Sequence, residues 1–282
     1  MPKKLKVYYA KVPNMGDVLN RDIIEKCFGY EVERHSYLTA QVSGIGSGLG
    51  NFTYEGQAWK NALKAVSGIL FPEVYIWGTG FVRYKDADTR LYKRKTHVCA
   101  VRGELSKRRV EAMVGHALDV PTGDAGILAS SILNRIPEKR YDVGVIAHYK
   151  EQEEPAFKRL LERYPNSCFI DVRKTPLEVT ESIAQCETVI SSSLHGLIIA
   201  DSLRVPNVHV VVTDRLLGDG FKFDDYYSAY GLDHRFIDLR QEETGSLDDI
   251  RRSYRITDAM VEDKKSGMLA SFPFPAVAGA RG

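Results

Sequence analysis

The amino-acid sequence predicts an α/β protein built from two Rossmann-like domains that face each other across a cleft. Short apolar runs alternate with helical patterns along most of the 282 residues. Repeated strand–turn–helix units are typical of parallel sheets covered by helices on both faces. The polar segment 134–140, which contains Pro137, separates two series of such units. The chain is long enough for two domains of roughly 130 residues each.

The first series begins with a strand at 5–9 and a helix at 18–28 that ends at Gly29, a residue typical of helix C-caps. The elements expected after it are a strand at 41–45 that runs into a glycine-rich loop, a helix at 59–69, strands at 74–77 and 97–101, a basic helix that ends at Val114, and a short helix that opens at 121–126. This series defines a predicted N-terminal domain over residues 1–135.

The second series has the same character. Its expected strands are at 141–147, 167–172, 188–190 and 207–212, and its expected helices are at 156–164, 176–186 and 197–203. These elements define a predicted C-terminal domain over residues 141–270. The segment 271–282 consists mainly of proline and small residues, so we expect a mobile tail there.

The composition is that of an ordinary soluble protein. A net charge of +2 and a pI near 8.2 are too balanced to indicate a nucleic-acid partner. No apolar run approaches the ~18 residues of a membrane span, and residues 1–6 lack the apolar core of a signal peptide. The four cysteines are scattered, with no CxxC pair and no histidines at metal-ligand spacing. We therefore expect a reduced, cytoplasmic protein without a metal site.

The most informative stretch comes where three serines and a histidine interrupt an apolar strand and a helix follows. Parallel α/β folds bind ligands at such junctions, between the carboxyl ends of strands and the N-termini of helices. The hydroxyls of Ser191, Ser192 and Ser193, with the backbone around Gly196, would suit a phosphate or a carboxylate. His195 adds a group that can exchange a proton near neutral pH. The alternative is a structural histidine buried between strand and helix.

Further candidate residues stand in other strand-to-helix turns. Asn14 and Asp17 lie between the first strand and its helix, and Asp124 lies in a similar turn. Each aspartate could accept a hydrogen bond from a substrate hydroxyl or could simply cap its helix. Arg102 directly follows a strand, where its guanidinium could hold an anion through two hydrogen bonds or form a surface salt bridge.

Two more cations follow the predicted strand at 207–212. Lys222 stands between Phe221 and Phe223, whose rings could contact a sugar, and Arg215 lies in the loop before them. Together they could bind an anionic donor. The alternative is a packed loop with exposed charges.

Well-known nucleotide and hydrolase signatures are absent from the sequence. The glycines at 44, 46, 48 and 50 lack the offsets of the dinucleotide-binding fingerprint. No GxxxxGK[ST] or GxSxG pattern occurs. The sequence therefore argues against NAD or FAD binding, a P-loop enzyme and an α/β hydrolase.

In family order over about residues 5 to 235, these motifs resemble those of the polysaccharide pyruvyl transferase family. The shared points are Asn-x-Gly-Asp (Asn14, Gly16, Asp17), Gly-x-Gly (Gly78, Gly80), the post-strand Arg102, Gly-Asp-x-Gly (Gly123, Asp124, Gly126), and a Ser-x-x-Leu-His-Gly segment followed by Pro206. Residues 221–226 are similar to the exopolysaccharide ketal-pyruvyl transferase subgroup. Ser193 stands where many members carry an arginine, so Arg215, Lys222 or Arg102 would have to replace that cation.

The resemblance implies a fold similar to B-type glycosyltransferases and a specific reaction. Pyruvate would pass from phosphoenolpyruvate to two hydroxyls of a sugar in a bacterial polysaccharide or its precursor, giving a cyclic ketal and phosphate without metal or cofactor. The N-terminal domain would take the acceptor, with Asn14, Gly16 and Asp124, and the C-terminal domain would take the donor. His195 would be the acid/base residue or a cationic ligand of the phosphate, and Asp17 would orient the acceptor.

Two other classes of function stay open at this point. A nucleotide-sugar glycosyltransferase could use the same fold, with Asp201 or Asp214 as a ribose ligand. A non-catalytic sugar- or anion-binding protein is the second alternative. If the acceptor of a pyruvyl transferase is lipid-linked, the enzyme would work at the inner face of the membrane as a peripheral protein.

Overall fold

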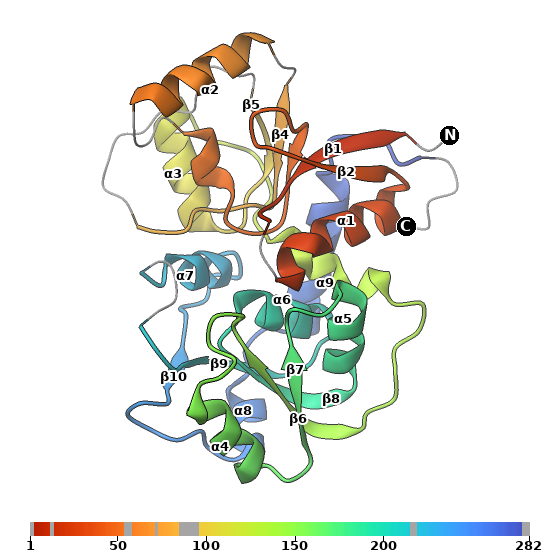
Figure 1. Ribbon diagram of the computed structural model, residues 1–282, viewed down its shortest axis with the longest axis vertical. Helices are drawn as coiled ribbons and strands as arrows, with labels where there is room; N and C mark the ends of the chain where they lie inside the picture. The colour runs from red at the N-terminus through yellow and green to blue at the C-terminus, as the bar shows by residue number, and fades with distance from the viewer. Residues whose placement is uncertain are drawn as a thin grey trace.

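A computed structural model describes residues 3–11, 14–53, 58–70, 73–84, 96–214 and 219–277. Its strands form two five-stranded sheets in which every pair is parallel (Figure 1). In spatial order the first sheet contains β2 (Glu31–His35), β1 (Lys4–Tyr8), β3 (Val42–Ser43), β4 (Val74–Trp77) and β5 (Thr96–Ala100). The second contains β10 (Phe236–Asp238), β9 (Asn207–Val211), β8 (Cys186–Ser191), β6 (Tyr141–Ala147) and β7 (Ser167–Asp171). The predicted class, two Rossmann-like α/β domains, is confirmed.

The two sheets share one topology. Numbered within its own sheet, each set of strands has the order 2-1-3-4-5. The chain therefore reverses its direction of sheet growth between β1 and β3 in the first sheet and between β6 and β8 in the second. Ligands of open α/β sheets bind at the carboxyl ends of the strands that flank this reversal. The topology therefore predicts a ligand site at the loops that follow β1 and β3 and at the loops that follow β6 and β8.

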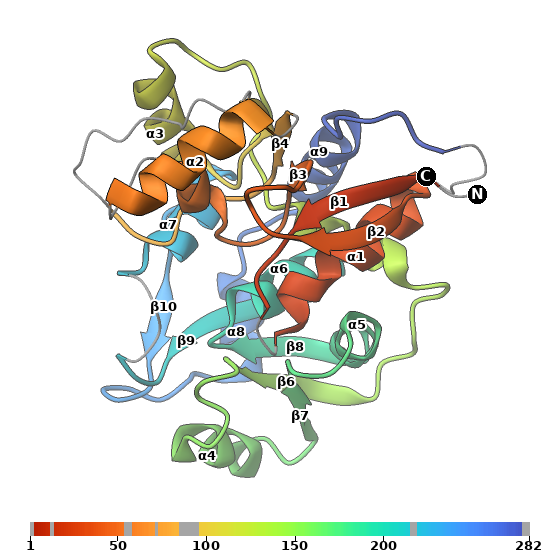
Figure 2. The same cartoon turned by 45° about the horizontal axis from the view of Figure 1, so that its top comes forward.

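Helices cover both sheets, as Figure 2 shows. Those before residue 140 are α1 (Met15–Phe28), α2 (Ala58–Leu70), α3 (Glu104–Val114) and the 3₁₀ helices η1 (Leu49–Phe52) and η2 (Ala125–Ile132). Those after it are α4 (Pro155–Arg163), α5 (Pro176–Ala184), α6 (Leu194–Ser202), α7 (Phe221–Ser228), α8 (Leu247–Ser253) and α9 (Asp258–Ala270). Among the described helices, none has both the length and the apolar character required to cross a bilayer.

Local sequence signals account for several of these boundaries. The side chain of Asn14 accepts a hydrogen bond from the Gly16 N–H and so caps α1, which ends at Gly29 with φ 75°. Thr175 and Glu178 form a capping box at the start of α5. These signals fix where the helices begin and end next to the candidate site.

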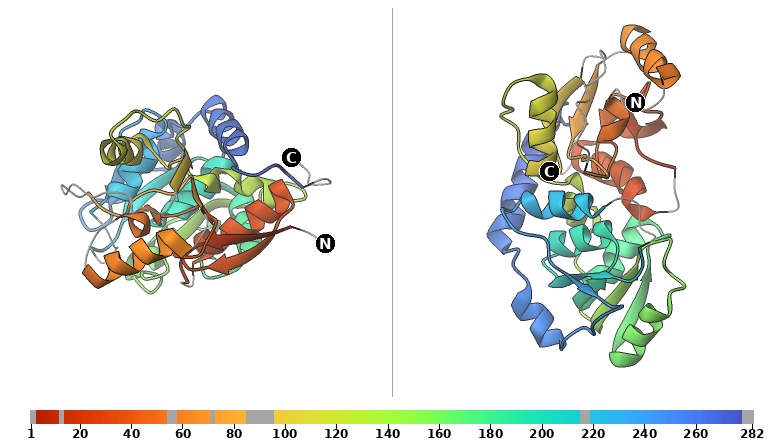
Figure 3. Two further views of the ribbon diagram at one scale, coloured as in Figure 1. Left: turned by 90° about the horizontal axis from the view of Figure 1, so that it is seen from above. Right: turned by 90° about the vertical axis from the view of Figure 1, so that its left-hand side faces the viewer.

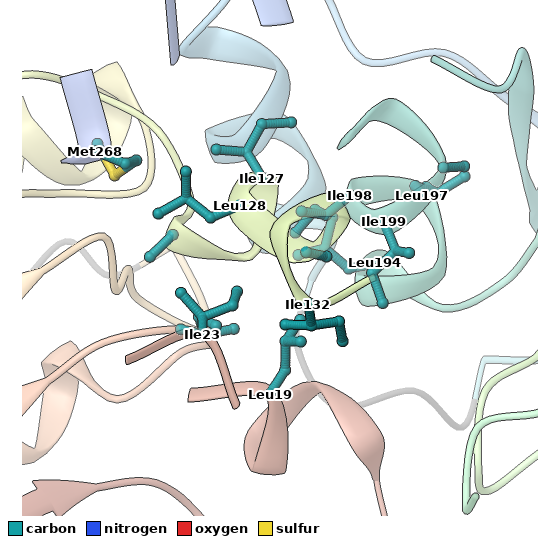
Figure 4. Packing of buried hydrophobic residues seen from close by; sticks show 14 of the residues in the cluster. Leu19, Ile23, Ile127, Leu128, Ile132, Leu194, Leu197, Ile198, Ile199 and Met268 are labelled. Atoms are coloured by element: carbon teal, nitrogen blue, oxygen red, sulfur yellow. The ribbon is translucent and has the colours of Figure 1, made fainter. Parts of the chain in front are cut away.

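A hydrophobic core joins the two halves of the molecule. Figure 4 shows η2 between α1 and α6, with Ile127, Leu128 and Ile132 facing residues such as Leu19 and Ile198. One core cluster contains residues of both sheets and of these three helices. The two sheets are therefore held together by an apolar interface, and this interface forms the base of the cleft between them.

The C-terminal segment departs from the predicted domain boundary. Helix α9, whose residues fall within the range predicted for the second domain, returns to the first (Figure 3). There, Trp77 Nε1 donates a hydrogen bond to the Met268 carbonyl at 2.9 Å. Phe272 stacks on Phe28 at 3.7 Å between ring centroids, and the Val277 N–H donates to the Phe28 carbonyl. Residues 271–277, for which we expected a mobile tail, are thus packed, because two aromatic side chains of the first domain need a cover.

Some elements were not foreseen. Residues 221–228 form helix α7 where the sequence suggested a loop, because its aromatic side chains are buried. Strand β2, with the sequence Glu-Val-Glu-Arg-His, is an edge strand whose residues are exposed or half-buried. Because most of its residues are charged or polar, the pattern of apolar runs in the sequence did not predict this strand.

Candidate active site

A cavity of about 240 Å³ lies between the two sheets, where their reversal points face each other. Its walls come from the ends of β1, β3, β6 and β8 and from the loops that follow them, with added contributions from α1 and α7. The lining residues are Tyr8, Tyr9, Ala10, Asn14, Asp17, Ser43, Ile45, Gly46, Ser47, Gly48, Val82, His148, Tyr149, Ser193, Leu194, His195 and Lys222. The cavity therefore stands where the topology places a ligand.

His195 lies in the first turn of α6, directly beyond β8. Its Nε2 atom is buried and has no hydrogen-bond partner among the described residues. The other side of the imidazole packs on the start of α1, where a Cβ atom on Gly16 would collide with the ring. Gly16 is thus required for close packing and does not itself line the cavity. A buried polar atom without a partner is costly in a folded protein and is commonly a functional group.

The environment of His195 keeps its imidazole neutral. Burial, followed by the positive charges of Lys222 and Arg102, lowers the pKa of His195 to about 3. The imidazole is therefore uncharged at neutral pH, which argues against its binding a phosphate as a cation.

Asp17 faces the same space from α1. Burial raises the pKa of its carboxyl to about 7, although hydrogen bonds from the Ala10 N–H and the Asn14 amide oppose this shift. A Cβ atom placed on Gly46 would lie 3.8 Å from Asp17 Oδ1 and 4.0 Å from His195 Nε2. The carboxyl and the imidazole therefore converge on one point above Gly46, whose φ of 103° lies in the region that favours glycine.

Lys222 brings a positive charge to this cavity from the first turn of α7. Burial and the charge of Arg102 lower the pKa of its ammonium group to about 8, while Glu151 raises it. Its Nζ lies 5.0 Å from the centroid of the Phe223 ring. Of the cations that the sequence suggested in place of the missing arginine, Lys222 is the one that lines the cavity in the described part of the chain.

Arg102 does not reach the cavity, which corrects the expectation that it binds the donor. It is fully buried, and its Nε donates to Asp225 Oδ2 at 2.9 Å. Its remaining donors hold the Phe81 carbonyl and the Ser47 hydroxyl. Because this guanidinium is already paired, it positions the Gly46–Ser47 turn instead of binding a ligand. Arg215 lies outside the described residues.

The three serines have different places. Ser193 lines the cavity as the N-cap residue of α6. The hydroxyl of Ser191 donates to the Ser193 carbonyl and accepts from the Ser193 N–H, so it shapes the turn from within. Ser192 accepts a hydrogen bond from the His148 N–H and donates to Glu151 Oε2. Ser191 and Ser192 are therefore structural here, contrary to their expected contact with the donor.

Two other predicted residues also support the site from behind. Gly196 packs against Ile146 and the Ser191 hydroxyl, where a Cβ atom would not fit. Asp124 is fully buried and caps η2 by accepting the Gly126 N–H at 2.9 Å. Asp124 does not line the cavity, so the structure does not bring it to the place where an acceptor was expected to contact it. Asn14, in contrast, lines the cavity, and its amide donates to Asp17 Oδ2 at 3.4 Å.

Sequence reasoning missed several residues that the topology brings to the site. His148 and Tyr149 directly follow β6, and Tyr8 ends β1. Glu151, almost fully buried, accepts hydrogen bonds from Ser192 and Thr213. The position of His148 after a predicted strand was a usable signal. The position of Glu151 gave no such signal, because its hydrogen-bond partners Ser192 and Thr213 follow β8 and β9, far along the chain.

The described residues contain no group of three or more acidic, histidine or cysteine side chains arranged to hold a metal ion. The aspartates considered as ribose ligands are also engaged. Asp201 is fully buried and accepts hydrogen bonds from Tyr226, Tyr254 and Asn207. Asp214 pairs with Arg240 at the surface.

The fold and this cavity define a two-domain α/β protein in which a neutral histidine and an aspartate line one cavity with a lysine. The sequence profile of polysaccharide pyruvyl transferases matches residues 17–214, which is more than half of the chain. The chain therefore belongs to the polysaccharide pyruvyl transferase family, whose members transfer pyruvyl groups in polysaccharide synthesis.

Individual relatives agree with this assignment to different degrees. The uncharacterized protein L143 of Acanthamoeba polyphaga mimivirus is 26% identical over 230 residues, covering 80% of this chain and 74% of that protein. The succinoglycan biosynthesis protein ExoV of Rhizobium meliloti (strain 1021) is 33% identical over 67 residues, which is 24% of this chain and 21% of ExoV. An α1,3-fucosyltransferase crystal structure aligns over 98% of this chain and 83% of its own with 10% identity. Its TM-score of 0.27 is too low to add to the description of the fold.

Proposed function

We propose that the protein transfers pyruvate from phosphoenolpyruvate to two hydroxyls of a sugar in a bacterial polysaccharide or its precursor. The carrying observation is the convergence of His195 Nε2 and Asp17 Oδ1 on one point in a cavity that Lys222 also lines. Membership of the pyruvyl transferase family supports the type of group transferred. We further propose a cytoplasmic location, where phosphoenolpyruvate is available, with neither metal nor cofactor.

The reaction needs one proton donor near the methylene carbon of phosphoenolpyruvate and one proton acceptor near the carbon beside it. Protonation of the methylene carbon of phosphoenolpyruvate makes the adjacent carbon electrophilic, and the first sugar hydroxyl attacks it and loses its proton. The C–O bond to phosphate then breaks, the second hydroxyl closes the ring, and its proton leaves with phosphate. The proton lost by the first hydroxyl then replaces the one that the donor gave to the new methyl group, and the proton of the second hydroxyl leaves on phosphate, so the protons balance over one turnover.

The pKa values suggest how the roles are divided. Asp17, with a pKa of about 7, is protonated in a large fraction of molecules at neutral pH and is our candidate for the proton donor. Neutral His195 is our candidate for the base that accepts the proton of the attacking hydroxyl. Lys222 would bind the phosphate or carboxylate of the donor in place of the arginine that many relatives have at position 193.

The proposal is tested by titrating phosphoenolpyruvate and a panel of nucleotide sugars against the wild-type protein in a calorimeter. We expect selective binding of phosphoenolpyruvate. His195→Gln should retain most of this binding and lose turnover by at least about 100-fold, the usual contribution of a general acid or base. Turnover is measured as phosphate release in the presence of an acceptor sugar.

A matched control keeps the test specific. His97 is an exposed histidine on β5 that pairs with Glu73, and His97→Gln should leave phosphate release unchanged. Selective binding of a nucleotide sugar would overturn the proposal in favour of glycosyl transfer. Full phosphate release by His195→Gln would overturn the role of His195 alone.

A further inference from the structure

Helix α2 exposes an unusual amount of apolar surface. Trp59, Leu63 and Leu70 are 59%, 50% and 69% exposed, and Val66 and Ile69 are exposed as well. No α2 residue whose burial the structure describes is buried. Figure 3 shows the helix at the outer edge of the first domain, and Figure 1 shows it at the end of the molecule far from the second domain. An exposed apolar patch of this kind is typical of an interaction surface.

The exposed residues form one stripe. Trp59, Leu63, Val66 and Leu70 are separated by four, three and four positions, which places them on one face of an α-helix. Asn61, Ala65 and Gly68 share the opposite side and are half-buried. The helix therefore rests on the protein through its small and polar side and turns its apolar side outward.

This orientation calls for a partner. A helix of 13 residues is marginal in water by itself, and most helices gain their stability by burying an apolar face. Here the face that should be buried is the one in contact with solvent. Exposing these apolar side chains to water does not stabilise the protein. Their presence on the surface is explained if an apolar partner covers this face of α2 when the protein functions.

The chemistry of the helix indicates the partner. Its sequence contains two lysines and no acidic residue, and Lys60 is exposed with its Nζ 5.5 Å from the centroid of the Trp59 ring. Helices that lie in a membrane interface combine a lysine-bearing polar face with a face of tryptophan and leucine. We propose that α2 docks the protein on an anionic membrane surface, with the stripe Trp59/Leu63/Val66/Leu70 inserted among the lipids.

Charge favours a membrane over a second copy of the chain. In a two-fold symmetric dimer each helix would face its own copy, and two positively charged segments without acidic residues would be brought together. Anionic lipid headgroups attract those same lysines. The charge of α2 therefore complements a membrane and opposes self-association.

The position of α2 suits an enzyme with a membrane-bound substrate. The helix follows η1, and Gly50 and Asn51 of η1 line a second cavity of about 230 Å³. That cavity shares Ser47 and Val82 with the main one. An acceptor sugar carried on a lipid would thus reach the main cavity through the second one, on the side of the protein where α2 contacts the membrane. This last point rests on the proposed function, whereas the docking itself does not.

Vesicle binding tests the docking directly. The full chain is mixed with vesicles of phosphatidylcholine alone or with added phosphatidylglycerol, and sedimentation is followed together with tryptophan emission. The chain has two tryptophans, and Trp77 is fully buried, so a change in emission reports Trp59. We expect binding and a blue shift with the anionic vesicles, both weakened by salt.

A double variant and a matched control complete the test. Leu63→Gln/Leu70→Gln should lower the partition coefficient by at least about tenfold, since two apolar side chains leave the stripe. Both positions are exposed, so the fold should be unaffected. Leu177→Gln, at a 43% exposed leucine of α5, should bind like the wild type.

Three results would overturn the docking. They are no binding of the wild type to anionic vesicles, equal binding by the double variant, or dimerisation in the absence of vesicles that the double variant abolishes. Phosphoenolpyruvate binding measured without vesicles is independent of all three. Failure of the docking and failure of the proposed reaction are therefore distinguishable.

Discussion

At the residue scale, Asp17 and Lys222 face one cavity with pKa values near 7 and 8. Burial disfavours the charged form of each, so it raises the pKa of the carboxyl and lowers that of the ammonium group. The proposed reaction needs a protonated Asp17 and a charged Lys222. Both states are lost as the pH rises, whereas His195 stays neutral throughout.

The pH dependence of kcat/KM should therefore show a decline above about pH 7, with a logarithmic slope that approaches two above about pH 8. In Lys222→Arg the cation keeps its charge, and the limiting slope should fall to about one. Phosphate release measured across pH gives both profiles. Lys150→Arg, at an exposed lysine beside the cavity, is the control and should keep the wild-type slope. A slope of two in Lys222→Arg would show that another group titrates.

The raised pKa of Asp17 also predicts a cost in stability. The unfolded carboxyl, with a pKa near 3.8, loses its proton before the folded one, so stability falls as the pH rises from about 4 to about 7. Asp17→Asn removes this loss and should increase the free energy of unfolding by about 2 kcal/mol at pH 8 but hardly at pH 3. Urea unfolding at both pH values measures the difference. An equal effect at the two pH values would contradict it.

Sequence reasoning at this scale worked where the chemistry is local. His195, Asp17 and Asn14 lie where a strand is followed by a helix, at the cap or in the first turn of that helix, and the rule that ligands bind there needs no knowledge of the sheet order. Arg102 was misjudged because its partner Asp225 is 123 residues away. A buried ion pair of that separation leaves no trace in the local sequence.

At the element scale, α7 links the two domains. Asp225 of this helix accepts hydrogen bonds from Arg102 and from the N–H and hydroxyl of Ser106 at the start of α3. The same helix carries Lys222 into the cavity one turn earlier. The buried ion pair therefore sets the position of the cation that faces the substrate.

Asp225→Asn should destabilise the protein by about 3 kcal/mol, because it leaves the guanidinium of Arg102 buried without a countercharge. The loss is measured by chemical denaturation at neutral pH. Asp233→Asn, which removes exposed ion pairs with Arg235 and Arg255, is the control and should have a much smaller effect. Similar losses in the two variants would mean that Arg102 finds another partner.

The sequence predicts helices and strands that bury an apolar face. It does not predict those whose formation depends on contacts with other helices or strands. Strands β4 and β6 coincide with their predicted ranges because their apolar side chains are nearly continuous. Strand β2 is charged because it pairs only with β1 at an edge of its sheet. Helix α7 is formed largely of aromatic and acidic residues, which are poor helix formers, and is held by its contacts with the first domain.

At the scale of the whole molecule, the C-terminal segment completes the first domain. Phe272 contacts the rings of Phe28 and Trp77 and is nearly fully buried. The sequence could show that residues 271–277 include aromatic side chains. It could not show that their binding site lies some 200 residues earlier, near Trp77.

Phe272→Ala should lower the free energy of unfolding by about 3 kcal/mol, as expected for a large-to-small change in a core. Thermal unfolding should remain a single transition, because one core cluster includes residues of both sheets. Phe169→Ala, at an exposed phenylalanine of β7, is the matched control with a smaller expected loss. A separate early transition in Phe272→Ala would show that the first domain unfolds alone.

The return of α9 also decides the order in which the molecule can be completed during synthesis. Domains commonly fold as they leave the ribosome, the N-terminal one first. Here the first domain cannot cover Trp77 and Phe28 until the last helix and the residues after it have been made. The nascent chain must therefore carry an open aromatic site while the whole second domain is translated.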